Sequence, residues 1–116
     1  MATKNELAIK VLQKLGVAEA GETPSTDDTG IVEDKYDSRY KVLAAKDLVS
    51  WGSGDDIPTE AVEPVTSIVA NDCLSEFIIP QDKQGIIARD ANQGLIDLLT
   101  LEYVDYVPEE PENYYF

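Results

Sequence analysis

The sequence predicts an all-α protein: a small bundle of about four helices with a long loop and an extended C-terminal tail. Apolar residues recur three and four positions apart in four segments, the spacing that places them on one face of a helix. Apolar residues make up 43% of the 116 positions, enough for one core of ordinary size. Two prolines near the end exclude a helix there. We therefore expect a helical domain over residues 1–101 and a C-terminal tail over residues 102–116.

The first predicted helix covers residues 4–15. Thr3 and Glu6 have the spacing of a capping box, in which the hydroxyl accepts a backbone N–H and the glutamate reaches back to the cap. Gly16 is placed to end the helix in a left-handed conformation. Between these signals the apolar residues form a single stripe: Leu7, Ala8, Val11, Leu12 and Leu15.

The second predicted helix begins at the N-cap Ser25, has acids in its first turn and runs to about Lys46. Its apolar face consists of Val32, Tyr36, Tyr40, Leu43 and Ala44. Two roles for the basic residues of this helix stay open. They face the acidic side of a neighbouring copy, or they form a solvent-exposed face. These residues are Lys35, Arg39, Lys41 and Lys46.

The long loop, residues 47–58, contains the only tryptophan, Trp51. Gly52-Ser53-Gly54 follows it but lacks the spacing and the basic residue of a phosphate-binding loop. Two roles for Trp51 stay open. It packs on the core or a hinge, or it is exposed and contacts a neighbouring subunit.

The third predicted helix begins after Pro58 and keeps helical spacing to Phe77, before Ile78-Ile79-Pro80 closes it. Pro64 predicts a bend or a shifted start. Cys73 lies on or beside the apolar face, which predicts a buried structural thiol. After a short link over residues 81–85, a fourth helix covers residues 86–99, weakened by Gly94. Residues 101–107 are rich in tyrosine and valine and predict an extended segment.

Net charge is −14 and is unevenly distributed. Residues 47–116 carry only two basic residues against fifteen acids, whereas residues 1–46 are nearly neutral. Such a surface repels phosphate, which excludes nucleic-acid binding by counterion release. An acidic surface of this kind is compatible with three roles: a surface that DNA slides past without binding, a binding site for a basic partner protein, or simple solubility.

The chain has no histidine and one cysteine. Catalytic triads, Cys-His pairs, histidine metal sites and internal disulfides are therefore excluded, and we expect no enzyme, no cofactor and no metal. No apolar run approaches a membrane span, and no signal peptide precedes the first helix. These features predict a soluble protein made in a cytoplasm, with no membrane partner.

The C-terminal tail holds four of the six tyrosines and one of the two phenylalanines, among acids and prolines. Exposed aromatic side chains are unfavourable in water unless they dock on another surface. The tail either folds back onto its own domain or, as we favour, binds another protein chain. The expected partner-binding residues are Tyr103, Tyr106, Tyr114, Tyr115, Phe116 and Trp51.

Three runs in the first 80 residues resemble the head–tail adaptor (connector) proteins of tailed bacteriophages. They are Glu-Leu-Ala-Ile-Lys-Val-Leu-Gln-Lys-Leu-Gly-Val (6–17), Gly-Glu-Thr-Pro-Ser-Thr-Asp-Asp (21–28) and Ile-Pro-Thr-Glu-Ala-Val-Glu-Pro-Val-Thr-Ser-Ile-Val-Ala (57–70), with Tyr36 and Tyr40 on the helix between. The order and spacing of the runs carry the resemblance, which covers residues 4–100. The matching residues are structural, at caps and turns: Leu15, Gly16, Pro24, Ser25 and Pro58.

The resemblance implies a virion structural protein assembled in the host cytoplasm. Such adaptors form a ring, commonly of twelve copies, that joins the portal to the phage tail or its nozzle and helps retain the packaged DNA. DNA passes through without specific binding. Residues 104–116 match no general pattern of the family.

One alternative is an acidic DNA mimic that inhibits a nucleic-acid enzyme. The net charge supports it, but the near neutrality of residues 1–46 argues against acids spread over the whole surface. A hydrolase with paired carboxylates has no positive support.

Overall fold

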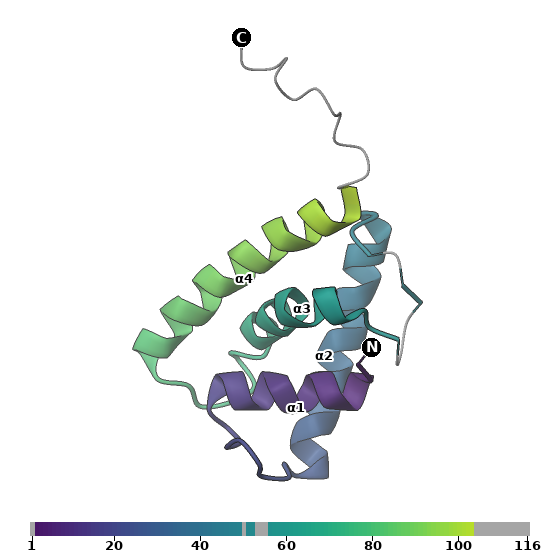
Figure 1. Ribbon diagram of the computed structural model, residues 1–116. Coiled ribbons are helices and arrows are strands. Elements are labelled where there is room, and N and C mark those ends of the chain that lie inside the picture. The colour runs from purple at the N-terminus through teal and green to yellow at the C-terminus, as the bar shows by residue number, and fades with distance from the viewer. Residues whose placement is uncertain (1, 50, 53–55, 104–116) are drawn as a thin grey trace.

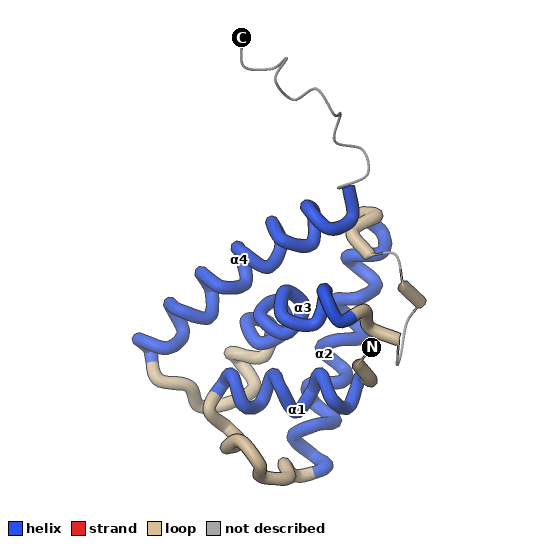
Figure 2. The backbone as a smooth tube through the Cα atoms, in the orientation of Figure 1, coloured by secondary structure: helices blue, strands red, loops and turns tan. Residues whose placement is uncertain are grey.

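A computed structural model describes residues 2–49, 51–52 and 56–103, and these residues form an all-α fold (Figures 1 and 2). The helices are α1 (Lys4–Leu15), α2 (Thr26–Ala45), α3 (Thr59–Asp72) and α4 (Gln81–Tyr103). The β-pairing within the described part is a single antiparallel bridge between Ala2 and Ile57. The predicted four-helix bundle with a long loop between the second and third helices is confirmed.

Helix α3 forms the centre of the molecule and packs against α1, α2 and α4, whereas α4 is an outer layer that packs chiefly on α3 (Figure 1). A helix that is apolar around most of its circumference belongs in a core. The buried residues of α3 fit this rule: Ala61, Val62, Pro64, Val65, Thr66, Ile68, Val69 and Ala70. The helix begins at Thr59 and runs through Pro64, so the shifted start considered for this proline is wrong.

The predicted caps of the first two helices are confirmed. The Glu6 N–H donates to the Thr3 hydroxyl at 3.0 Å, and the Thr3 N–H donates to the Glu6 carboxylate at 2.8 Å. Gly16 ends α1 with φ at 82°, a left-handed conformation that glycine adopts without strain. At the start of α2 the Asp28 N–H donates to the Ser25 hydroxyl at 3.1 Å.

The boundaries between the last two helices differ from the prediction. Helix α3 ends at Asp72, with Cys73 as its C-cap, and does not reach Phe77. Asn and Asp side chains compete for backbone hydrogen bonds and favour helix ends, and Asn71 and Asp72 occupy this end. The following turn, in which the Glu76 N–H donates to the Cys73 carbonyl, lets the chain return along α3.

Helix α4 is longer at both ends than the sequence predicts. It begins at Gln81, directly after Pro80, where a link was expected, and continues to Tyr103, so residues 101–103 are helical. The Gln84 side chain donates to the Ile79 carbonyl at 2.8 Å, and the Gln84 N–H donates to the Pro80 carbonyl. These bonds hold the first turn despite Gly85. Packing on α3 stabilises the rest of the helix against its local preferences.

Gly94 allows α3 and α4 to approach closely. A β-carbon added at Gly94 would lie 2.7 Å from the carbonyl oxygen of Pro64, a distance that real β-carbons do not show. On the same face of α4, Ile87, Ala91 and Leu98 are buried. Helix α4 continues through Gly94, and the absence of a side chain there permits the close packing of the two helices.

Candidate interaction surfaces

Trp51 packs on the body of the molecule. Its side chain is half-buried against the core, and its indole N–H donates to the Tyr36 hydroxyl at 3.1 Å. The rings of Tyr40 and Trp51 are tilted, with centroids 6.3 Å apart, and the Tyr40 hydroxyl donates to the Trp51 carbonyl. These contacts fasten the long loop to α2. They correspond to the core-packing alternative, and a further contact of Trp51 with a neighbouring subunit stays a prediction.

The other predicted partner-binding residues lie at or beyond the end of α4. Tyr103 is the last residue of that helix. Tyr106, Tyr114, Tyr115 and Phe116 lie outside the described residues. The docking role of the C-terminal tail therefore stays a prediction.

Two of the basic residues on α2 form ion pairs within the chain. The Arg39 guanidinium binds both oxygens of Asp72 at 2.8 and 2.7 Å, in a two-bond geometry that links α2 to the end of α3. The Lys35 ammonium lies 3.2 Å from a carboxylate oxygen of Glu76. The acids that Lys35 and Arg39 face thus belong to their own chain, whereas Lys41 and Lys46 are exposed.

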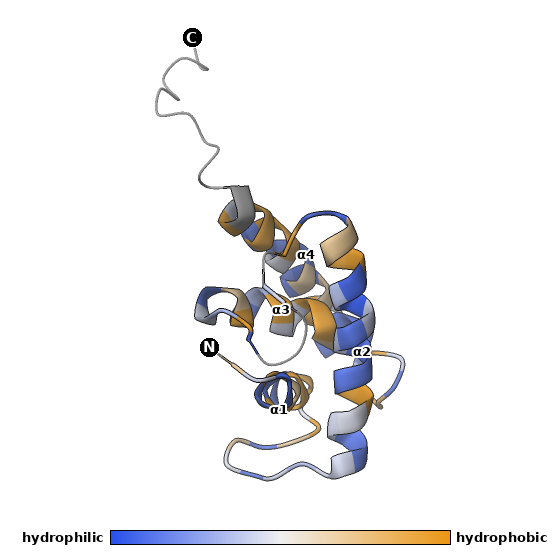
Figure 3. Ribbon diagram, turned by 90° about the vertical axis from the view of Figure 1, so that its right-hand side faces the viewer, coloured by the Kyte–Doolittle hydropathy of each residue, from blue (hydrophilic) through white to orange (hydrophobic). Residues whose placement is uncertain are grey.

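The face of α4 that points away from α3 is exposed and partly apolar. Four positions on α4 are buried (87, 91, 94 and 98), and a second set of exposed residues covers one flank and the back of the helix relative to this buried face. Ile96 and Leu99 in this set are 56% and 48% exposed. We call this set the outer strip of α4; its residues are Ala88, Arg89, Asn92, Ile96 and Leu99. Hydrophobic residues are visible towards the C-terminal end of α4 (Figure 3).

The acids in the middle of α4 lie on a different flank. Asp90 and Asp97 line a shallow recess together with Pro64 and Ser67 of α3, so they border that helix. The ammonium of Lys14 lies 2.9 Å from a carboxylate oxygen of Asp90. That hydrogen bond is the main reason why the pKa of Asp90 is lowered, and the positive charges of Lys14 and Arg89 lower it further, against the effect of burial. The outer strip thus contains Arg89 and no acid.

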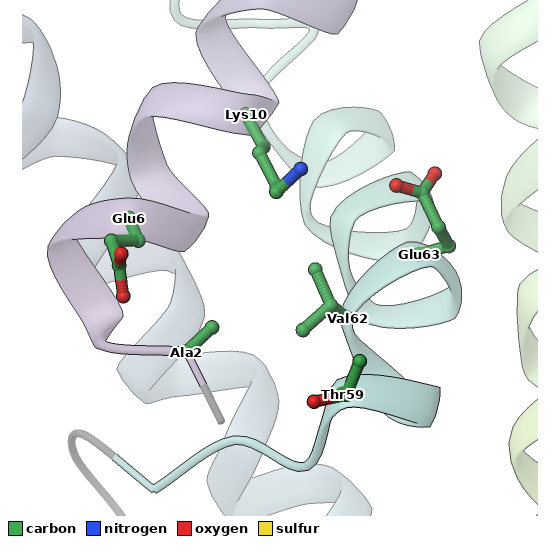
Figure 4. A pocket seen from close by; sticks show the side chains of 6 residues that line it. All are labelled: Ala2, Glu6, Lys10, Thr59, Val62 and Glu63. Carbon is green, nitrogen blue, oxygen red and sulfur yellow. The ribbon is translucent and has the colours of Figure 1, made fainter.

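A recess of about 340 Å³ lies between α1 and the start of α3 (Figure 4). Ala2 and Val62 form its apolar part, and Lys10 extends from α1 towards α3. Glu6 on its rim accepts the capping hydrogen bond of α1.

Cys73 is a buried structural thiol, as predicted. Its side chain is fully buried. Its pKa is raised to about 12, chiefly by burial and also by the negative charges of Asp72 and Glu76, against the opposing effect of Lys35. A thiol that stays protonated near neutral pH is a poor nucleophile. Across the described part of the chain, no three His, Cys, Asp or Glu residues are grouped so as to hold a metal ion.

Comparison with known proteins gives no relative. No protein-family model, no curated protein and no solved structure matches the chain. None of the helices, as far as their residues are described, has the length and hydrophobicity needed to cross a bilayer. Any functional conclusion therefore depends on the residues themselves.

Sequence reasoning did not identify the outer strip of α4. The predicted helix over residues 86–99 did not separate buried from exposed apolar residues: Leu98 is buried, whereas Ile86 and Leu99 are about half exposed. The sequence does contain one sign of an exposed apolar surface on α4. This helix has more apolar residues than its buried stripe needs, since Ile96 and Leu101 do not fit that stripe. Ile78, in the turn before α4, is also fully exposed.

Proposed function

We propose that this protein is a non-enzymatic virion structural protein, the adaptor that joins the portal of a tailed bacteriophage to its tail. Copies assemble in the host cytoplasm as a ring beneath the portal, bind the phage tail or its nozzle, and help retain the packaged DNA. The observation that carries the proposal is the order and spacing of the three sequence runs at residues 6–17, 21–28 and 57–70.

The helix boundaries support the proposal that these three runs determine the shape of the helical body. Gly16 ends α1, Ser25 caps α2 and Pro58 precedes α3, so the runs fall where the chain starts and stops its helices. Residues that set the helix boundaries fix the shape of the body. Similar runs in another chain would therefore produce a similar arrangement of the first three helices.

The charge distribution suits a ring through which DNA passes. Basic side chains in the channel would hold the phosphates, whereas acids let them slide. Fifteen acids between residues 47 and 116 are available for such a lining. A ring also needs two different complementary surfaces on each subunit, because its contacts are head-to-tail. The exposed apolar residues of α4 supply one candidate surface.

The DNA-mimic alternative receives less support. A mimic would present a continuous array of unpaired acids, but Asp37, Asp72, Glu76 and Asp90 each form an ion pair with a cation of the same chain. Part of the negative charge is therefore neutralised on the body of the molecule.

Binding to the cognate portal tests the proposal. We expect the isolated chain to be a monomer or a weak oligomer and to form a ring only on the portal. Mass measurement of the chain alone, of the portal alone and of the mixture would show a discrete increase, and electron microscopy would place the added density beneath the portal. A chain that does not bind a cognate portal would refute the adaptor.

A further inference from the structure

The outer strip of α4 has no partner in the fold. Helix α4 packs chiefly on α3, and the strip lies outside this contact, with Ile96 and Leu99 about half exposed. Apolar residues repeated along one exposed helix face indicate a binding surface more strongly than single exposed residues do. We propose that residues 104–116 of one copy bind the outer strip of α4 on a second copy.

The length of the segment fits the surface. The strip extends from Ala88 to Leu99, about 17 Å along the helix at the standard rise. Residues 104–116 span up to about 43 Å when extended, and Pro108 and Pro111 favour an extended backbone. Fewer than half of these residues are needed to cover the strip, and the remainder can bridge the distance between two copies.

The sequence favours a second copy over the same chain. Helix α4 ends at Tyr103, next to the C-terminal end of the strip, so binding in the same chain requires an early reversal. Val104, Tyr106 and Val107 are of the β-branched and aromatic types that favour extended backbone. Pro108 also restricts the residue before it to an extended conformation. These preferences disfavour the early reversal and favour a strip on a second copy.

The charges of the two surfaces are complementary. The segment carries four acids, at positions 105, 109, 110 and 112, and no basic residue. In a chain of net charge −14, most of the surface repels such a segment. The outer strip has no acid, and Arg89 forms no ion pair with a described residue. Arg89 can pair with an acid of the segment or stack on an aromatic ring, while Tyr and Phe side chains cover Ile96 and Leu99.

The contact is of the kind that closes a ring. Each copy gives a segment and receives one on a different surface, so the interaction is head-to-tail. Its use in a ring rests on the proposed function, but the pairwise contact does not. It names the neighbouring copy as the binding partner of the C-terminal tail.

Mixed labelling of the full-length chain tests the proposal. One preparation carries Glu110→Cys with a nitroxide label, and the other is ¹⁵N-labelled and unmodified. Because Cys73 is buried, we expect it not to take up the label in the folded chain. At millimolar concentration we expect the label to broaden the amide signals of residues 88–99 on the ¹⁵N copy. The same signals stay sharp after the nitroxide is reduced.

Two substitutions in the ¹⁵N copy locate the surface. Leu99→Asp should weaken the broadening at residues 88–99 about tenfold, because it removes an apolar part of the proposed contact. Arg89→Glu, a second variant, should weaken it by a smaller factor of about two to five, because an exposed ion pair contributes less. Val42→Asp is the matched control, since Val42 is 43% exposed and Leu99 48%, and it should leave the broadening unchanged. Circular dichroism confirms that each variant is folded.

Three results would overturn the inference: no broadening, broadening on another surface, or broadening only when the label and ¹⁵N are in the same chain. Portal binding is measured separately. Broadening at residues 88–99 in a chain that ignores the portal would refute the adaptor alone. No broadening in a chain that assembles on the portal would refute the contact alone.

Discussion

At the scale of single residues, Cys73 makes the burial of the core measurable. Its thiol is fully buried at the end of α3. A rise in its pKa from 9.0 to about 12 lowers the thiolate fraction about a thousandfold at a given pH below both values. We expect a thiol reagent at pH 8 to react with Cys73 only when the fold opens.

Reaction in guanidinium chloride provides the reference rate, because the unfolded thiol is exposed. The native rate should be at least about a hundredfold slower. Equal rates in the native and unfolded chains would show that Cys73 is accessible and would contradict its placement in the core.

The Lys14–Asp90 pair predicts a specific dependence of stability on pH. The hydrogen bond from Lys14 lowers the pKa of Asp90 in the folded chain. The pair therefore adds stability above the ordinary pKa of about 3.9, and this is lost as the pH falls through the lower folded value. Asp90→Asn should reduce the free energy of unfolding at pH 7 and have little effect near pH 2.

Urea unfolding at both pH values measures the difference. A double-mutant cycle with Lys14→Met separates the pair from other effects of each substitution. The coupling between the two sites should be present at pH 7 and vanish in acid. A coupling that persists at pH 2 would show that the carboxylate is not the group responsible.

At the scale of helices, starts were easier to predict than ends. The starts of α1 and α2 are marked by residues that bond to free backbone N–H groups, and these caps are local. The end of α3 and the start of α4 depend on the turn that brings the two helices together. Periodicity alone cannot reveal such a turn, because Phe77 and Ile79 continue the apolar spacing beyond Asp72.

The candidate surfaces also differ in whether local sequence or tertiary packing reveals them. Composition pointed to the aromatic C-terminal tail, since aromatic side chains near prolines need no tertiary information to be noticed. The outer strip of α4 could not be separated from the core in the sequence. Leu98 and Leu99 are adjacent and equally apolar, and only the packing of α4 on α3 buries one and exposes the other.

The close approach of α3 and α4 at Gly94 predicts that a larger residue at this position destabilises the fold. Gly94→Ala would place a methyl group 2.7 Å from the Pro64 carbonyl oxygen, so the helices must separate. We expect a loss of about 1–3 kcal/mol in the free energy of unfolding. Gly85→Ala is the matched control, because its added methyl meets no atom within 4 Å and alanine favours the helix.

The control should be stabilised by about 0.5–1 kcal/mol. Chemical denaturation of the two variants beside the parent chain provides the measurement. The prediction lies in the opposite signs of the two changes. Two changes of the same sign would mean that helix propensity, and not the contact with Pro64, governs position 94.

At the scale of the whole molecule, the core formed by the described residues runs from Leu7 in α1 to Leu98 in α4. A chain lacking residues 108–116 keeps all of these core residues. We therefore expect its helical circular dichroism to equal that of the parent. Assembly on the portal should weaken, because the deletion removes aromatic side chains that we expect to contact another chain.

A full-length variant with serine at positions 114, 115 and 116 separates the aromatic side chains from the acids and the length of the C-terminal tail. It should fold like the parent and assemble about as poorly as the deletion, since charge alone contributes little to such a contact. Loss of helical signal in either variant would favour a C-terminal tail that folds back on its own domain. Unchanged assembly in both would leave the C-terminal tail without a role in docking, and binding would then depend on the body of the molecule.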